Sequence, residues 1–280
     1  MNKNMIARIA VAAVAIPAIL WICYQGGWWL KGMVSLFAII GLSEFLFHEN
    51  IKPNKALFSI SYVVLFFLLL ITLFIDLFGS KNTEFSTGVV VGILLILGMV
   101  IATGKDDPKE LFERYTRLLF GLFYIGLLYP YVYFVGQGVT FYNIEGGHWL
   151  LFLFAILWVG DSAALFLGKA IGKNKLAPSV SPNKTVEGFF GGVTGAILVG
   201  IVMSYTLFDQ VPIRHLLLIS VGCSIFGQLG DLVESMWKRS LNIKDSSNII
   251  PGHGGVLDRF DSLLFAAPFM YFYMHRIFLF

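Results

Sequence analysis

Hydrophobic residues follow one another along most of this chain in long stretches, and short polar segments separate these stretches. A helix needs about 20 residues to cross about 30 Å of hydrocarbon. Stretches near this length lie at about residues 5–24, 28–47, 56–78, 87–103, 117–137, 148–168, 188–207, 214–235 and 262–279. The pattern predicts an all-α fold, a polytopic membrane helix bundle with about nine transmembrane helices.

The positions of Lys and Arg predict an orientation for these helices. If the N-terminus lies in the cytoplasm and the chain alternates across the membrane, only four of the 20 Lys and Arg residues fall outside: Lys31, Lys81, Arg214 and Arg276. Cytoplasmic loops of membrane proteins carry an excess of Lys and Arg. We therefore expect a cytoplasmic N-terminus and a C-terminus on the outer side.

Composition supports a membrane protein and excludes some function classes. Hydrophobic residues make up 57% of the chain and charged residues 13%, which is about half the charged share of a soluble domain. A dispersed net charge of +3 argues against nucleic-acid binding. Cys23 and Cys223 lie in apolar stretches without metal-binding spacing, which predicts buried free thiols. The N-terminal stretch resembles a signal peptide, but more apolar stretches follow it, so we expect an uncleaved first span.

Acidic residues occur in the predicted C-terminal helices, always toward the predicted cytoplasmic side. They are Asp161, Asp231, Glu234, Asp258 and Asp261. A carboxylate at membrane depth costs at least about 2.5 kcal/mol and usually marks a pathway or a site. Carboxylates from two helix ends, without a nearby His or Cys cluster, suit a hard cation such as Mg²⁺. For Asp258 and Asp261 the alternative is helix capping, in which a carboxylate complements the helix dipole.

One face of the predicted helix at 214–235 is polar. Ser224, Gln228, Asp231 and Ser235 are spaced four, three and four residues apart, so they share one side of an α-helix. This face could line a site. The alternative is that its side chains form hydrogen bonds between helices.

Two loops on the predicted cytoplasmic side carry further polar residues. In the loop at 168–187, Ser181 is expected to cap a helix that has Pro182 at its first position. Because helix N-termini with nearby lysine bind phosphate, Lys184 and Thr185 are candidate phosphate contacts. The alternative is an ordinary positively charged loop.

The second loop, at 236–259, contains Gly252, Gly254 and Gly255. Glycines there would let backbone amides turn toward an anion. His253 lies among them, and an isolated histidine is more often a turn residue than a catalyst.

The predicted spans and loops divide the chain into N-terminal membrane helices at 1–140 and C-terminal catalytic membrane helices at 141–280, which include both loops.

The segment 235–261 resembles the signature of CDP-diacylglycerol synthases, also called phosphatidate cytidylyltransferases. The signature residues that occur at the family spacing are Ser235, Lys238, Arg239, Lys244, Asp245, Pro251, His253, Gly254, Gly255, Asp258, Arg259 and Asp261. Trp237 departs from the usual smaller aliphatic residue or Phe, at a position expected to serve packing. The segment 160–188 resembles a second conserved segment of the family, so the resemblance covers about the C-terminal half of the chain.

This resemblance implies a reaction and its partners. The family transfers CMP from CTP, often also from dCTP, to phosphatidic acid and releases pyrophosphate, which yields CDP-diacylglycerol for phospholipid synthesis. Its fold is a dimeric bundle of nine helices with a metal centre and a funnel open to the cytosol. The resemblance thus implies a homodimeric, multi-pass enzyme of the inner cell membrane that uses Mg²⁺, contacts membrane lipid and has its active site facing the cytoplasm.

Residue chemistry and the resemblance together suggest a role for each candidate. Asp231 and Asp258 are the expected main Mg²⁺ ligands, with Asp261 as a third. The other expected catalytic residues are Lys238, Arg239, His253 and Arg259. The expected substrate-binding residues are Ser181, Asn183, Lys184, Thr185, Lys244, Asp245, Gly254 and Gly255.

Two other functions stay open from the sequence. A polyprenol or phytol kinase of similar architecture would pass the γ-phosphoryl group of CTP to an alcohol, although the full His-Gly-Gly signature argues against this reading. A secondary transporter would use Asp161 and Asp231 as an ion site. Against a transporter stand the lack of an inverted repeat and the gathering of polar residues on one side of the membrane.

Overall fold

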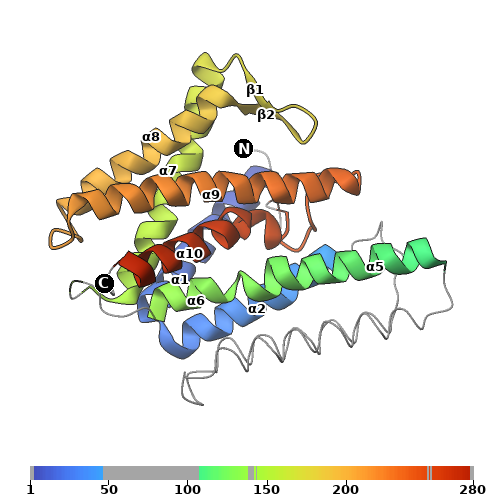
Figure 1. Ribbon diagram of the computed structural model, residues 1–280, viewed down its shortest axis with the longest axis horizontal. Coiled ribbons are helices and arrows are strands. Elements are labelled where there is room, and N and C mark those ends of the chain that lie inside the picture. The colour runs from blue at the N-terminus through green and yellow to red at the C-terminus, as the bar shows by residue number, and fades with distance from the viewer. Residues whose placement is uncertain are drawn as a thin grey trace. The chain divides into compact units, whose positions relative to one another are not determined.

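The computed structural model describes residues 3–46, 107–137, 142, 144–250, 252 and 254–277. The two predicted spans at 56–78 and 87–103 lie outside the described residues, as do Pro251 and His253. The helices are α1 (Lys3–Gln25), α2 (Gly27–Leu46), α5 (Pro108–Gly121), α6 (Pro130–Gln137), α7 (Gly146–Ile171), α8 (Val186–Ser204), α9 (Ile213–Ser240) and α10 (Leu257–Ile277), with a π-helical segment η2 (Leu122–Leu127) between α5 and α6. The described part of the chain is therefore mainly helical, as predicted (Figure 1).

Several of these helices are long and apolar enough to cross a membrane. Within the described residues they are the segments Gly27–Leu46, Pro108–Gln137, Gly146–Ile171, Val186–Ser204 and Ile213–Ser240. Both ends of each segment lie within about five residues of the ends of a predicted span, with one exception. The segment Pro108–Gln137 ends where its predicted span ends but begins well before residue 117. The apolar pattern thus located these five segments correctly, whereas the total of about nine transmembrane helices stays a prediction.

The chain forms two compact units. One comprises residues 34–130, and the other comprises residues 1–33 together with 131–280. In the first unit, aromatic rings of α2 and α5–η2 pack together: the ring centroids of Phe45 and Phe120 lie 5.7 Å apart, and those of Phe120 and Tyr124 lie 5.5 Å apart. Every candidate site residue belongs to the second unit.

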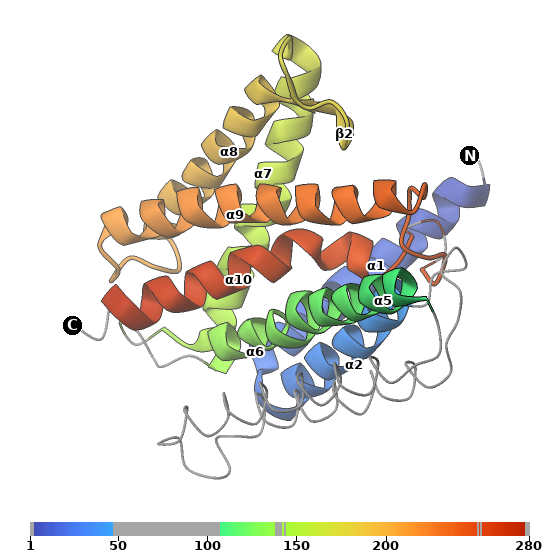
Figure 2. The ribbon, with the colours of Figure 1, turned by 45° about the vertical axis from the view of Figure 1, so that its right-hand side comes forward.

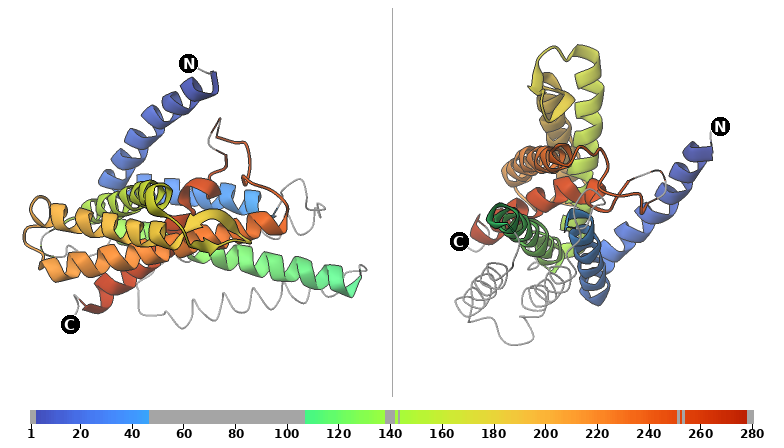
Figure 3. Two further views of the ribbon diagram at one scale, coloured as in Figure 1. Left: turned by 90° about the horizontal axis from the view of Figure 1, so that it is seen from above. Right: turned by 90° about the vertical axis from the view of Figure 1, so that its right-hand side faces the viewer.

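Small residues bring the helices of the second unit close together. Between α7 and α8, a Cβ atom added at Gly195 would lie 2.7 Å from the Cβ of Ala163, so the two helices touch almost backbone to backbone. Between α9 and α10, a Cβ at Gly230 would lie 2.6 Å from the carbonyl oxygen of Asp261. Figures 2 and 3 show α9 beside α10, and α8 running along α7. The glycine at position 230 therefore sets how near the acidic start of α10 comes to α9.

A small β-hairpin joins α7 to α8. Strand β1 (Lys175–Ala177) pairs antiparallel with β2 (Ser181–Thr185), with Lys175 opposite Thr185 and Ala177 opposite Ser181. The expectation that Ser181 and Pro182 begin a helix is wrong, and the all-α prediction missed this two-stranded sheet. The helix begins later because Thr185 provides the cap: its hydroxyl accepts a 3.0 Å hydrogen bond from the Gly188 N–H.

The base of the hairpin is attached to α8. The Glu187 carboxylate, in the first turn of α8, accepts hydrogen bonds from the Asn174 backbone N–H at 3.2 Å and from Asn174 Nδ2 at 2.8 Å. The Val186 N–H in turn donates to the Asn174 carbonyl oxygen. These bonds attach the base of the hairpin to the first turn of α8.

Candidate active site

The polar face of α9 lies against α8 and the hairpin. Gln228 Nε2 donates to the Phe189 carbonyl oxygen of α8 and to Ser224 Oγ, both at 3.3 Å, so the interhelical hydrogen bonding considered for this stripe is confirmed at Gln228. Two turns further on, Ser235 Oγ donates to Asp231 Oδ1 at 3.3 Å. The stripe therefore changes along the helix, from helix–helix contact to a cluster of acidic groups.

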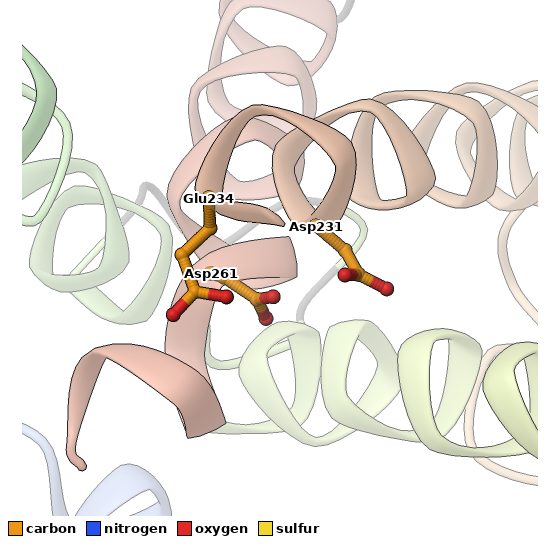
Figure 4. Close-up of side chains that lie close together, drawn as sticks. All are labelled: Asp231, Glu234 and Asp261. Carbon is orange, nitrogen blue, oxygen red and sulfur yellow. The ribbon is translucent and has the colours of Figure 1, made fainter. Parts of the chain in front are cut away.

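Three carboxylates from two helices converge at this end of α9. Asp231 and Glu234 of α9 and Asp261 of α10 each present an oxygen, and these oxygens all lie within 4.8 Å of one another (Figure 4). Asp231 and Glu234 are three residues apart on α9 and so face the same way. Asp261 joins them because α10 approaches α9 so closely at Gly230.

Glu234 is the member of this cluster that was not chosen as a ligand from the sequence. It was counted among the acidic residues, and its three-residue spacing from Asp231 was the signal that could have identified it. Its side chain is only 1% exposed. A buried carboxylate is costly unless a cation compensates it, and Lys238 supplies one such charge. Glu234 is a cation-site candidate because its oxygen also converges with those of Asp231 and Asp261.

Asp258 is held by a different set of contacts. Its Oδ2 accepts hydrogen bonds from the Ser246 N–H at 2.8 Å, from Ser246 Oγ at 2.9 Å and from the Gly255 N–H at 2.8 Å. Gly254 has a φ of 81°, which favours glycine, and lies in the turn that presents the Gly255 amide. In this structure that amide therefore faces Asp258, and the predicted role of Asp258 as a metal ligand stays a prediction.

Lys238 links Asp258 to the three-carboxylate cluster. Its Nζ lies 2.6 Å from Asp258 Oδ1 and 2.6 Å from Glu234 Oε2, and its side chain is 12% exposed. A second ammonium group reaches the cluster from the hairpin, because Lys184 Nζ lies 2.5 Å from Asp231 Oδ2. Two lysines thus contact three carboxylates, and the carboxylate of Asp261 lies beside them, so negative charges outnumber positive ones in this arrangement, which suits a cation.

The guanidinium of Arg239 contacts main-chain oxygens. Its Nε donates to the Val180 carbonyl at 3.3 Å, in the turn of the hairpin, and its Nη1 donates to the Ile243 carbonyl at 2.8 Å, just after α9. Arg239 therefore joins the hairpin to the segment that follows α9.

Two adjoining cavities surround these residues. The smaller, of about 280 Å³, is lined by Asp161, Asp231, Glu234, Ser235, Lys238, Arg239, Lys244, Asp245, Asp258, Arg259, Asp261 and Ser262. The larger, of about 680 Å³, is lined by Asp161, Ala164, Leu165, Gly168, Lys169, Leu176, Asn183, Lys184, Thr185, Gly188, Phe189, Gln228 and Asp231. Asp161 and Asp231 line both cavities, so a charged pocket adjoins one whose walls are partly apolar.

The structure thus brings together most of the predicted site residues. Asn183, Lys184 and Thr185 line the larger cavity, and the candidates on α9, on α10 and in the loop at 244–245 line the smaller one. Ser181 is instead taken up in strand pairing with Ala177 and is not among the lining residues of either cavity. Gly254 and Gly255 shape the turn beside Asp258.

The donor atoms of the acidic cluster fit a hard divalent cation. Carboxylate oxygens are the ligands that Mg²⁺ and Ca²⁺ prefer, whereas zinc favours His and Cys. Asp231, Glu234 and Asp261 offer oxygens only, from two rigid helices, at a separation that one ion could bridge. The charged groups of Lys184 and Lys238 lie at the edge of this cluster, where they could contact an anion bound to such an ion.

Comparison with known proteins places the chain in a family. The model of the cytidylyltransferase family matches residues 6–277. A phosphatidate cytidylyltransferase of Staphylococcus haemolyticus is 35% identical over 268 residues, which are 95% of this chain and 97% of that protein. One of Bacillus subtilis is 33% identical over 273 residues, 96% of this chain and 97% of that protein. The chain therefore belongs to the cytidylyltransferase family.

Proposed function

We propose that this protein is a phosphatidate cytidylyltransferase, which transfers CMP from CTP to phosphatidic acid and forms CDP-diacylglycerol and pyrophosphate for phospholipid synthesis. The observation that carries this proposal is the match to relatives of that name over nearly the full length of both chains. The described geometry is consistent with it, since an acidic cluster and several basic side chains share one cavity.

Asp231, Glu234 and Asp261 are the residues proposed to hold Mg²⁺. The ion would supply positive charge to the triphosphate of CTP, whose negative charge otherwise repels an anionic nucleophile. Asp231, in contact with Lys184, and Glu234, in contact with Lys238, would each keep a basic group beside the bound phosphates. Asp258 remains a further candidate ligand, since its Oδ1 contacts the same Lys238 Nζ that contacts Glu234.

The reaction needs positioning more than proton transfer. A phosphate oxygen of phosphatidic acid attacks the α-phosphorus of CTP, a new P–O bond forms, and the bond to the bridging oxygen breaks so that pyrophosphate leaves with its electron pair. The nucleophile is already an anion, so no strong general base is required. Lys184, Lys238 and Arg259 would offset the negative charge of the phosphates, which is the main source of rate acceleration in such a transfer.

The two cavities suggest where the substrates bind. The smaller cavity, lined by the acidic cluster and by Lys238, Arg239 and Arg259, suits the triphosphate. The larger cavity has Leu165, Leu176 and Phe189 in its wall and suits part of a lipid. Because Asp231 lines both, the phosphate of the lipid and the α-phosphate of CTP could meet beside it.

The membrane arrangement is proposed from the charge pattern and the family. About nine transmembrane helices with a cytoplasmic N-terminus would place most Lys and Arg residues on the inner side. The active site would then face the cytoplasm, where CTP or dCTP is available, in the inner membrane of a bacterial cell. A homodimer is proposed from the family resemblance.

The position of the label in CTP tests the proposed reaction. We expect that purified protein in detergent micelles containing phosphatidic acid and Mg²⁺ moves ³²P from α-labelled CTP into the lipid, and leaves ³²P from γ-labelled CTP in pyrophosphate. Micelles with an alcohol lipid in place of phosphatidic acid serve as the control and should give no labelled lipid. Transfer of the γ-label to that alcohol would instead indicate a kinase, and no transfer of either label would contradict the proposal.

A further inference from the structure

The β1–β2 hairpin crosses toward the C-terminal half of α9, on the side of the acidic cluster (Figures 1 and 2). A two-stranded hairpin is marginally stable by itself in water. This one has strands of three and five residues, so contacts with the helices must hold it in place. Its position matters for the proposed reaction, because Lys184 of β2 reaches Asp231 from it.

The hairpin is held at two places besides that ion pair. At its base, Asn174 is hydrogen-bonded to Glu187 of α8. At its turn, the Val180 carbonyl accepts a hydrogen bond from Arg239 Nε, while Arg239 Nη1 donates to the Ile243 carbonyl. A planar guanidinium with donors in fixed directions is suited to joining two such carbonyls.

We propose that Arg239 is a positioning residue: it fixes the turn of the hairpin to the end of α9, and thereby keeps Lys184 beside the acidic cluster. Two of its three guanidinium nitrogens are already engaged by main-chain oxygens. Arg239 therefore acts through Lys184, and its positive charge is not its main contribution. This inference rests on the proposed cytidylyltransferase reaction for its kinetic consequences, although the attachment of the hairpin does not depend on that reaction.

A double-mutant cycle separates positioning from direct phosphate binding. We expect Lys184→Met to lower kcat/KM for CTP by about 100-fold and Arg239→Gln to lower it by about tenfold. If Arg239 acts through Lys184, the double variant falls no more than about threefold below Lys184→Met, because the hairpin no longer has a lysine to position. Losses that multiply to about 1,000-fold would show that Arg239 acts independently and would overturn the proposal.

A second measurement follows the hairpin without using activity. A nitroxide spin label is attached at Ser179→Cys, in the exposed turn, in a chain whose buried Cys23 and Cys223 are replaced. Arg239→Gln should increase the nanosecond mobility of this label, whereas Arg214→Gln, at the opposite end of α9, should leave it unchanged. Unchanged mobility in Arg239→Gln would overturn the proposal, as would increased mobility combined with multiplicative losses in the cycle.

Controls keep the two proposals distinguishable. If the wild-type protein transfers no label from CTP, the proposed function fails, and the spin label still reports whether Arg239 holds the hairpin. If Arg239→Gln does not fold, as judged by its thermal unfolding midpoint in detergent, Arg239→Lys is used. A lysine keeps the charge but cannot join both carbonyls, so increased label mobility is expected there too, and mobility equal to wild type would overturn the proposal.

Discussion

Replacing Asp261 by asparagine is expected to lower kcat for CMP transfer by about three orders of magnitude, because it removes one of three converging carboxylates from the proposed cation site. Asparagine has nearly the same shape as aspartate. Its side-chain oxygen can still accept the 2.6 Å hydrogen bond that the Ser262 N–H donates to Asp261 Oδ1. The loss should therefore reflect charge at the site rather than a failure to fold, and initial rates with α-labelled CTP in micelles measure it.

A matched control is available for this variant. Asp209 lies exposed in the connection between α8 and α9, at the opposite end of α9 from the cluster, so Asp209→Asn makes the same chemical change away from the site. It should keep near wild-type turnover. If Asp261→Asn also kept turnover within about tenfold of wild type, with the same dependence on Mg²⁺, its proposed role as a ligand would be wrong.

Replacing Lys238 by methionine should damage both folding and activity. The lysine lies between Glu234 and Asp258 at 2.6 Å from each, and the two carboxylates are 1% and 3% exposed. Removing one partner of a buried ion pair leaves uncompensated charge, which typically costs about 3–5 kcal/mol. We expect the free energy of unfolding in mixed micelles to fall by about 3 kcal/mol, and CMP transfer by more than about 100-fold.

The same change at an exposed lysine provides the comparison. Lys175→Met, on β1 of the hairpin, removes an equal charge at a solvent-exposed position and should alter the free energy of unfolding by less than about 0.5 kcal/mol. Equal stability of Lys238→Met and wild type would mean that Lys238 does not compensate Glu234 and Asp258 in the folded protein.

The long helices could be predicted from the sequence because their signal is local. Apolar stretches of about 20 residues are visible without knowledge of neighbours, and α7, α8 and α9 lie where the pattern predicted them. The hairpin could not be found this way. Its strands are too short for a clear alternation of polar and apolar residues, and Pro182 resembles the first residue of a helix.

The site was predictable only in part, for a physical reason. The polar stripe along α9 identified Asp231, and the start of a predicted helix together with the resemblance identified Asp261, but whether the two meet depends on how closely α10 approaches α9 at Gly230. That approach is tertiary packing, which sequence spacing does not contain. The position of Glu234 beside Asp231 on α9 was visible in their spacing, but its meeting with Asp261 was not. Likewise, the hydrogen bond from Arg239 to the Val180 carbonyl depends on the hairpin, which was not predicted.

Binding of Mn²⁺ as a substitute for Mg²⁺, followed by electron paramagnetic resonance, tests most directly whether the carboxylates of α9 and α10 hold a divalent cation. We predict that wild-type protein stripped with EDTA binds Mn²⁺, that Mg²⁺ displaces it, and that Glu234→Gln and Asp261→Asn each weaken Mn²⁺ binding by at least about tenfold. Asp209→Asn should bind as the wild type does. Equal Mn²⁺ binding by the wild type and by both cluster variants, or no binding by the wild type, would contradict the account.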